Sequence, residues 1–320
     1  MLSRHFFREK VLQTLYAYTI SENSDLVVVE KNMLSAIDRL YDLYIYQLSV
    51  VPELIDTVNR LLEDASQKYF PEESERVANE KFVNNRISTA LISNGDFKKK
   101  RERLKINWAG ERDIFKTIYN SFKTKEIYKT YLQKEEHSFE DDRQILSELF
   151  KYAINYPALV DKFIEKNLYW EDDFFQIAQL SYNTLRSIED SFDEYAALPE
   201  FFDGNEDGKS NEDRRFMIDL LRKAVLHDEK LTEMIKKRIS KWEYERIAVM
   251  DIILVKMAIV EFLYFPSIPV KVTINEYIEL SKEFSTEKSK TFVNAILDKV
   301  VVDLKEDGLL KKAGRGLING

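Results

Sequence analysis

Apolar residues recur every three or four positions along most of the 320-residue chain, a spacing typical of amphipathic helices. In the middle of the chain it predicts helices over 28–68, 81–104, 111–133, 142–168 and 171–197. Pro52 predicts a break or kink in the first of these. Only eight Gly and six Pro occur in the whole chain, so the material for β-turns is scarce. The pattern therefore predicts an all-α protein.

A helical hairpin is the clearest local pattern, in "PVKVTINEYIELSKEFSTEKSKTFVNAILDKV" at 269–300. Thr273 followed by Glu276 predicts a capping box and a helix from about Ile274. A second helix follows, with apolar residues at helical spacing: Phe292, Val293, Ile296, Leu297, Val300, Val301 and Leu304. The corner at 285–290 combines hydroxyls with lysines near a helix N-terminus, which suits a phosphate. An ordinary solvated turn is the alternative.

The amino-acid composition limits the kinds of chemistry that the chain can perform. The chain has no Cys and only three His, so disulfides, thiolate metal sites and Cys/His catalysis are not expected, and neither is a cofactor. No apolar run approaches the ~20 residues of a membrane helix and no signal-peptide pattern opens the chain, so we expect a cytoplasmic protein without a membrane partner. The net charge of −8 means that any nucleic-acid site must be local.

Three stretches carry a resemblance to a known family: "SRHFFREKVLQTLYAY", "WEYERIAVMDIILVKMAIVEFLYFPSIP" and "IPVKVTINEYIELSKEFSTEKSKTFVNAILDKV". They resemble the NusB family of bacterial transcription antitermination factors over roughly 1–20 and 213–304. The resemblance implies an all-helical bundle in the bacterial cytoplasm, without a catalytic centre. It also implies partners: boxA-type single-stranded RNA, the small ribosomal subunit protein NusE, and a transcription elongation complex with other Nus factors.

The resemblance also implies site residues. The opening basic helix matches the family at Arg4, Arg8, Glu9 and Gln13. His5 and Phe6 stand where the family has arginines. We expect weaker RNA binding from this helix, compensated by the hairpin corner. The expected RNA-binding set is Arg4, His5, Arg8, Lys10, Gln13, Lys288, Lys290 and Phe292. Phe292 is equally well interpreted as a core residue. Glu245 and Asp251, expected on one helix, match acidic positions that face the ribosomal partner; solvated acids are the alternative.

The middle of the chain has no counterpart in short family members. We expect the basic helix at 1–20, an inserted helical region at 21–200, a polar hinge at 201–212, a NusB-like C-terminal bundle at 213–304 and a flexible tail at 305–320. Residues 142–170 align with 213–242, both beginning Asp-Arg and ending in Trp. This suggests a degenerate internal duplication, although any two amphipathic helix pairs align tolerably.

Two further segments suggest ligands. "FKKKRERLKINW" at 97–108 places aromatics around a basic run, which suits RNA backbone and base stacking; a solvated face is the alternative. Its candidate residues are Lys98, Lys99, Lys100, Arg101, Arg103 and Lys105. "DGNEDGKSNEDR" at 203–214 resembles an EF-hand loop, but Arg214 replaces the bidentate Glu, so a hinge is favoured over a calcium site.

Two other functions compete with the main interpretation. The altered basic helix is also consistent with a non-enzymatic scaffold in ribosome biogenesis whose RNA binding is reduced or lost. NusB-like domains also precede rRNA methyltransferase domains, but the segment after Lys305, "EDGLLKKAGRGLING", shows no Gly-rich strand–helix turn of a methyl-donor fold.

Overall fold

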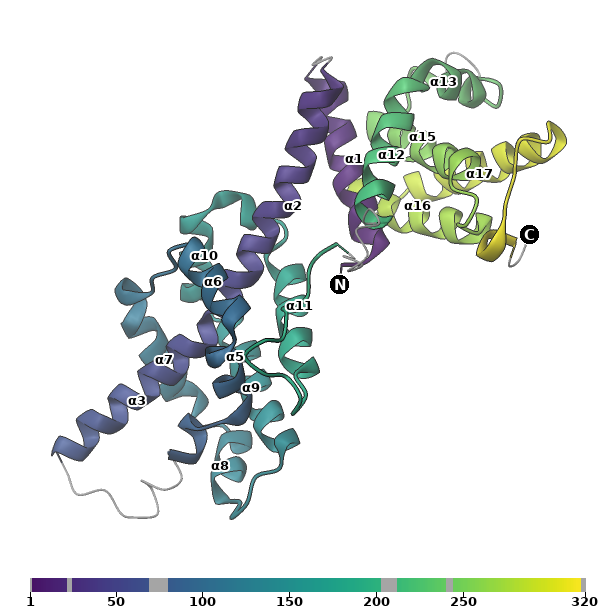
Figure 1. Cartoon of the computed structure of the whole chain (residues 1–320). Coiled ribbons are helices and arrows are strands. Elements are labelled where there is room, and N and C mark those ends of the chain that lie inside the picture. Colours follow the sequence, from purple (N-terminus) through teal and green to yellow (C-terminus); the bar gives the residue numbers. More distant parts are fainter. Residues whose placement is uncertain (1, 22–24, 69–79, 203–211, 240–243, 318–320) are drawn as a thin grey trace. The chain divides into compact units, whose positions relative to one another are not determined.

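The computed structural model describes residues 2–21, 25–68, 80–202, 212–239 and 244–317, and every regular element in these ranges is a helix (Figure 1). The predicted all-α fold is confirmed. Most of the EF-hand-like segment at 203–214 lies outside the described residues. None of the described helices is both long enough and apolar enough to cross a membrane.

The chain divides into two compact units. Unit 1 comprises Met1–Ser35 and Phe202–Gly320, and unit 2 comprises Ala36–Phe201. The boundary near residue 35 falls within helix α2 (Leu26–Leu48). Unit 1 therefore joins the first helix of the chain to its C-terminal third.

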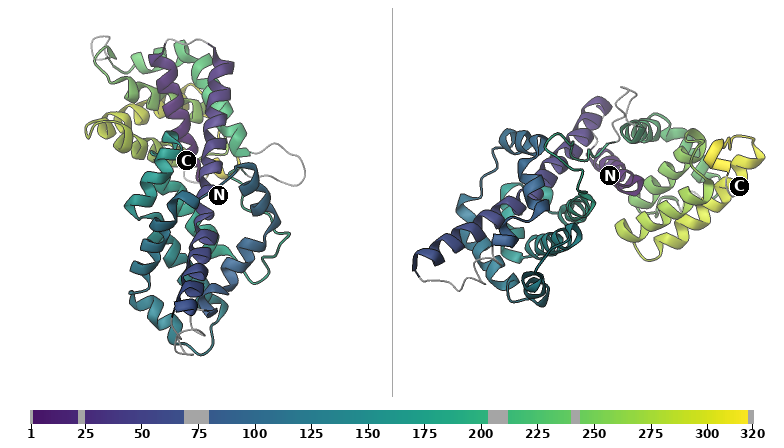
Figure 2. Two further views of the ribbon diagram at one scale, coloured as in Figure 1. Left: turned by 90° about the vertical axis from the view of Figure 1, so that its left-hand side faces the viewer. Right: turned by 60° about the horizontal axis from the view of Figure 1, so that its bottom comes forward.

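Helix α15 (Val249–Tyr264) is the centre of unit 1. Its sequence, "VMDIILVKMAIVEFLY", is apolar on nearly every face, as expected for a helix surrounded by others. It packs against α1 (Arg4–Ile20), α12 (Glu212–Leu226), α13 (Asp228–Lys236), α16 (Val270–Phe284) and α17 (Ser289–Glu306). Helix α1 also lies along α12, and Figure 1 shows the two side by side. Figure 2 gives two further views of the same helices. A 3-10 turn follows at Gly314–Leu317.

The capping box predicted at Thr273 and Glu276 is absent, and this prediction is wrong. Helix α16 begins at Val270, directly after Pro269, rather than at Ile274. The Thr273 hydroxyl donates to Glu261 Oε2 at 3.1 Å, and Glu276 accepts hydrogen bonds from α1. Both side chains have partners on other helices, so neither is available to cap its own. The second helix of the hairpin is α17, and its predicted apolar residues are buried apart from half-buried Phe292.

Helix α9 (Phe139–Ile154) is the centre of unit 2, where it packs against α3, α5, α7 and α11. The other helices are α3 (Val50–Lys68), α5 (Arg86–Ser93), α6 (Gly95–Arg103), α7 (Arg112–Phe122), α8 (Glu126–Gln133), α10 (Pro157–Lys166) and α11 (Phe174–Ser187), with 3-10 turns at Ala109–Glu111 and Leu168–Trp170.

Two breaks among these helices are each explained by a single residue. The break predicted at Pro52 is confirmed, because α2 ends at Leu48 and Pro52 lies in the first turn of α3, where its missing N–H costs nothing. The predicted single helix at 81–104 is wrong. Asn94 divides it into α5 and α6, since its side chain caps α6 at Phe97 N and also donates to Asp193 O and Ala196 O.

Candidate nucleic-acid interface

The first turn of α1 carries the cations expected to bind RNA. Ser3 caps the helix, its hydroxyl accepting from Phe6 N at 3.3 Å. Arg4 Nε donates to Asp213 Oδ1 at 2.9 Å, and its Nη2 lies 3.4 Å from Glu212 Oε2. The Arg4 side chain is 39% exposed, so it is partly neutralised but still reachable from solvent.

Arg8, in contrast, faces inward. Its Nε donates to Glu261 Oε1 at 2.6 Å and its Nη2 to Glu261 Oε2 at 3.1 Å, while Nη1 donates to Glu276 Oε2 at 3.1 Å. The Arg8 side chain is 3% exposed and that of Glu261 is fully buried. The guanidinium is therefore used within the fold and offers no free face to an RNA phosphate.

Glu261 is a fully hydrogen-bonded buried carboxylate. Besides Arg8, it accepts from Tyr277 OH at 2.8 Å and from Thr273 Oγ1 at 3.1 Å. Burial lowers the pKa of Arg8, but the charge and hydrogen bonds of Glu261 outweigh burial and raise that pKa above its ordinary value. Burial, and then the negative charge of Glu261, raise the pKa of Tyr277. This network joins α1, α15 and α16.

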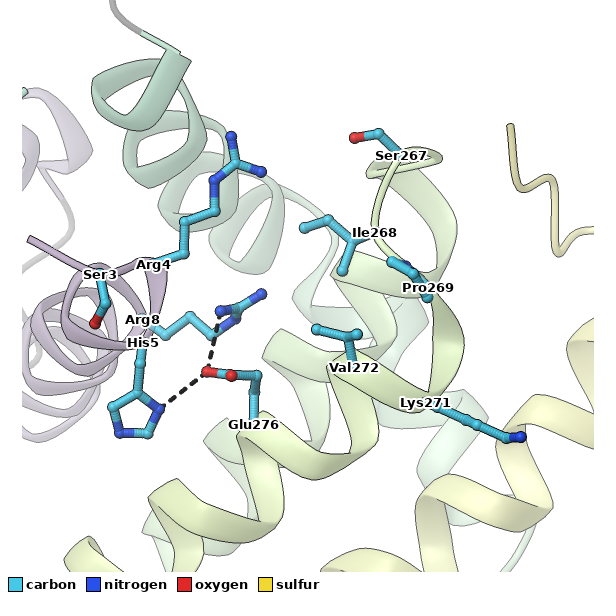
Figure 3. Close-up of a pocket in the computed structure, with 10 residues that line it drawn as sticks. All are labelled: Ser3, Arg4, His5, Arg8, Ser267, Ile268, Pro269, Lys271, Val272 and Glu276. Atoms are coloured by element: carbon cyan, nitrogen blue, oxygen red, sulfur yellow. Dashed lines mark hydrogen bonds and ion pairs between the residues drawn. The ribbon is translucent and has the colours of Figure 1, made fainter. Parts of the chain in front are cut away.

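His5 extends the contact between α1 and α16. Its Nδ1 lies 2.9 Å from Glu276 Oε2, and its Nε2 lies 3.5 Å from Glu283 Oε2, near the end of α16. Figure 3 shows Glu276 pointing toward both His5 and Arg8. These residues line a pocket of about 470 Å³ between α1 and the turn before α16. Lys271 also lines it, but its ammonium group points away from Glu276 (Figure 3).

Lys10 and Gln13 are hydrogen-bonded to each other. Lys10 Nζ donates to Gln13 Oε1 at 3.1 Å and lies 3.3 Å from Glu9 Oε1, and the Lys10 side chain is 7% exposed. Gln13 Nε2 donates to Glu9 Oε1 at 3.2 Å. Among the α1 residues of the expected set, Arg4, His5 and Gln13 are therefore partly exposed, whereas Arg8 and Lys10 are buried.

The α16–α17 corner keeps its lysines outside. Lys288 and Lys290 are exposed, and neither has an ion-pair partner in the part of the chain that the structure describes. Phe292 is half-buried. His5 contacts Glu283, so the start of α1 lies beside the end of α16 that leads into this corner. Two segments far apart in the sequence thus meet on one side of unit 1.

The corner hydroxyls point inward instead. Ser289 is 3% exposed, and its hydroxyl donates to Asp251 Oδ2 at 2.8 Å. The hydroxyls of Ser285 and Thr286 each lie 2.9 Å from Ser289 Oγ. The corner is therefore not solvated throughout, because the Ser289 hydroxyl is buried beneath it. A phosphate at the corner would meet the lysines rather than this hydroxyl.

The prediction that Glu245 and Asp251 share a helix is also wrong. Glu245 precedes α15 and is exposed, whereas Asp251 lies in the first turn of α15 and is 6% exposed. Asp251 holds the start of α17 through Ser289, and its negative charge suits the positive end of that helix. Only Glu245 remains accessible to a partner.

The basic run of unit 2 is partly neutralised. Lys100 Nζ donates to Asp96 Oδ2 and to Tyr41 OH, both at 2.7 Å. Arg101 pairs with Glu53 at 3.5 Å and Arg103 with Asp42 at 3.2 Å. Lys98, Lys99 and Lys105 are exposed. The aromatic residues expected to stack bases, Phe97 and Trp108, are each 1% exposed, so that expectation is wrong.

The residues that sequence reasoning missed are the acidic partners, Glu261 and Glu276. Glu261 lies in the apolar second half of α15, and a carboxylate surrounded by apolar residues is a signal for a buried ion pair. Within the described residues, no group of three or more His, Cys, Asp or Glu is arranged to hold a metal ion.

These features define unit 1 as an all-helical bundle built around a buried arginine–glutamate pair, with exposed lysines at one corner. The family model described as "NusB family" matches residues 174–302. Over this region the chain is similar to the NusB family, as the resemblance predicted.

Two curated relatives carry the name "Transcription antitermination protein NusB". The protein from Salinibacter ruber is 43% identical over 105 residues, which cover 33% of this chain and 66% of the relative. The protein from Chloroherpeton thalassium is 39% identical over 104 residues, covering 32% of this chain and 49% of the relative. The chain thus spans just under two thirds of the length of the Salinibacter protein and about half of the length of the Chloroherpeton protein. No solved structure matches the chain.

Proposed function

We propose that this protein is a non-catalytic transcription antitermination factor of the bacterial cytoplasm. It binds a boxA-type single-stranded RNA together with the small ribosomal subunit protein NusE and joins an elongation complex with other Nus factors. Two observations support this: the names of the curated relatives, and the exposed Lys288 and Lys290 beside the half-buried ring of Phe292. Lysines bind the RNA backbone and an aromatic face stacks a splayed base.

The single observation that carries the RNA site is the exposure of the corner lysines beside the start of α1. Arg4 and His5 form the other side of this RNA-binding surface. Arg8, Lys10 and Gln13 support it indirectly, through hydrogen bonds to other residues of unit 1. Lys98, Lys99 and Lys105 on unit 2 are an auxiliary RNA contact, and exposed Glu245 steers the basic ribosomal partner.

The test is a titration of boxA-type RNA with a double variant, Lys288→Gln/Lys290→Gln. A matched control, Lys299→Gln/Lys305→Gln, removes two exposed lysines from the same helix. We expect the corner variant to lose about tenfold in affinity at low salt. The slope of log K against log salt should fall by roughly 1.4, which corresponds to two single-strand phosphate contacts. Equal binding by the two variants contradicts the proposed site.

A non-enzymatic scaffold in ribosome biogenesis is the second candidate function. It is favoured by the burial of Arg8 and Lys10, which leaves the basic helix with few accessible charges. Under this alternative the protein still binds NusE but does not bind boxA RNA even at low salt. Under the main proposal NusE raises the affinity for RNA, and RNA raises the affinity for NusE by the same factor.

A further inference from the structure

A second ligand-sized pocket lies in unit 2, outside everything described above. It has a volume of about 630 Å³, within the range of small-ligand sites, and is formed where α7 and α8 meet the α9–α10 turn. Its lining includes Lys125, Lys151, Tyr152 and Tyr156. Cations and aromatic rings thus gather around one hollow.

The tyrosines give the pocket its ring surface. Both Tyr152 and Tyr156 are half-buried, with ring centroids 6.5 Å apart at an interplanar angle of 53°. Behind them, the buried ring of Phe122 lies 5.8 Å from Tyr152 and fixes its position. Tyr156 stands at the start of α10, where its backbone N–H donates to Ala153 O at 2.9 Å. The rings are therefore held in place yet remain reachable from solvent.

The charges favour an anionic ligand. Lys125 and Lys151 are exposed, and neither pairs with a carboxylate within the described ranges. Lys125 Nζ instead lies 4.5 Å from the centroid of the Tyr152 ring, and Lys151 Nζ lies 6.0 Å from that of Tyr182. The acid that lines the pocket, Glu148, accepts a hydrogen bond from Tyr182 OH at 3.3 Å. Two uncompensated cations thus face one engaged carboxylate.

We propose that this pocket binds single-stranded RNA, with a base stacked on Tyr156 and neighbouring phosphates on Lys125 and Lys151. Aromatic faces bind any unstacked base, and lysines bind the backbone, so binding has little sequence preference. An apolar peptide helix fits less well, because such helices need aliphatic grooves, and this pocket has two aliphatic side chains in its lining, Ile127 and Pro157. The site extends the proposed RNA binding to unit 2 and is testable separately from it.

The experiment measures binding of the full-length protein to a fluorescein-labelled 12-mer of oligouridine, which lacks a boxA element, by fluorescence anisotropy. The charge variant is Lys125→Gln/Lys151→Gln, matched by Lys116→Gln/Lys230→Gln, two exposed lysines outside the pocket. We expect the charge variant to weaken binding about tenfold, with the salt slope falling by roughly 1.4, and the control to bind as the wild type does.

The stacking variant is Tyr156→Leu, matched by Tyr195→Leu at a tyrosine that is 84% exposed. Tyr156→Leu should weaken binding by about fivefold or more without changing the salt slope, since it removes stacking but no charge. Tyr156→Phe keeps the ring and should bind as the wild type does. If Tyr156→Leu fails to fold by circular dichroism, the charge variant and a 4-thiouridine crosslink to 122–157 still decide the question.

The proposal is overturned if the charge variant and its control bind oligouridine equally, or if crosslinks fall only at 98–105 or 285–292. It is also overturned if a folded Tyr156→Leu variant binds oligouridine as tightly as the wild type does, since the pocket would then offer two lysines to any polyanion and no stacking face to a base. Variants of Lys288 and Lys290 report on the other site in the boxA titration. Failure of one site is therefore distinguishable from failure of the other.

Discussion

The buried pair between Arg8 and Glu261 leads to the sharpest prediction. Removing one member of a buried ion pair strands the other charge and costs roughly 3–5 kcal/mol. Arg8→Met leaves Glu261 with two neutral donors, from Tyr277 and Thr273, so we expect a loss of about 4 kcal/mol. Glu261→Gln leaves Arg8 one remaining carboxylate, Glu276 at 3.1 Å, so we expect a smaller loss of about 2–3 kcal/mol.

The double variant provides a test, because its stability relative to Arg8→Met should change in a predictable direction. Arg8→Met/Glu261→Gln contains no stranded charge, so it should be more stable than Arg8→Met alone by about 2 kcal/mol. The matched control is Arg222→Met, which breaks a surface pair of Arg222 with Glu30 at 2.6 Å. An exposed pair of this kind contributes less than about 1 kcal/mol.

The assay is amide hydrogen exchange followed by mass spectrometry, because a chain of two compact units need not unfold in one step. Peptides from α1 and α15 report on unit 1, and peptides from α9 in unit 2 are the internal control. We expect Arg8→Met to speed exchange in α1 and α15 and to leave α9 unchanged. If the double variant is less stable than Arg8→Met, or if the stability losses of the two single variants simply add, then Arg8 and Glu261 do not stabilise the fold as a buried ion pair.

Three further predictions concern stability. Burial lowers the pKa of Lys312 to about 8, although the negative charge of Glu261 opposes this shift. In the unfolded chain the same ammonium group keeps its proton up to about pH 10.4. Between about pH 8 and 10 the unfolded chain therefore binds more protons, so the free energy of unfolding should rise. Solvent screening limits this gain in stability to under ~1 kcal/mol. If wild type and Lys312→Met differ in stability by the same amount at pH 7.5 and at pH 9.5, the prediction is wrong. Asn85→Ala should cost about 2 kcal/mol, measured as faster exchange in α5, because the Asn85 side chain caps that helix and donates to Asp142 O. Ser138→Ala should cost about 1 kcal/mol, measured in α9, because it removes a capping box; unchanged exchange in α9 contradicts this.

The helical periodicity was a sound guide because it depends on local spacing alone. It predicted the all-α fold, the break at Pro52 and the buried face of α17. The capping-box pattern misplaced the start of α16, and the periodicity joined α5 to α6, because Thr273 and Asn94 bind groups that are distant in sequence. Local reasoning cannot identify such partners. The periodicity also joined α7 to α8 and α9 to α10, which the structure separates.

The candidate site was harder to predict for the same reason. The basic residues of α1 were recognisable, but their partners lie elsewhere: Arg8 and Glu261 are 253 positions apart, and Arg4 and Asp213 are 209 apart. A charge in a sequence looks the same whether it meets solvent or a buried carboxylate. The assignment of Asp251 to a partner surface had the same weakness, since Ser289, 38 residues away, holds it inside the fold.

The sequence by itself determined the helical class, the approximate extent of the helical segments and the similarity of the C-terminal region to the NusB family, because propensity, periodicity and motif depend on neighbouring residues. Only the tertiary structure decided which cations remain accessible to a ligand. Packing buried Arg8 against Glu261 and left Lys288 and Lys290 in solvent. Whether a charge binds a ligand or stabilises the fold depends on its surroundings, and helices from opposite ends of the chain create those surroundings.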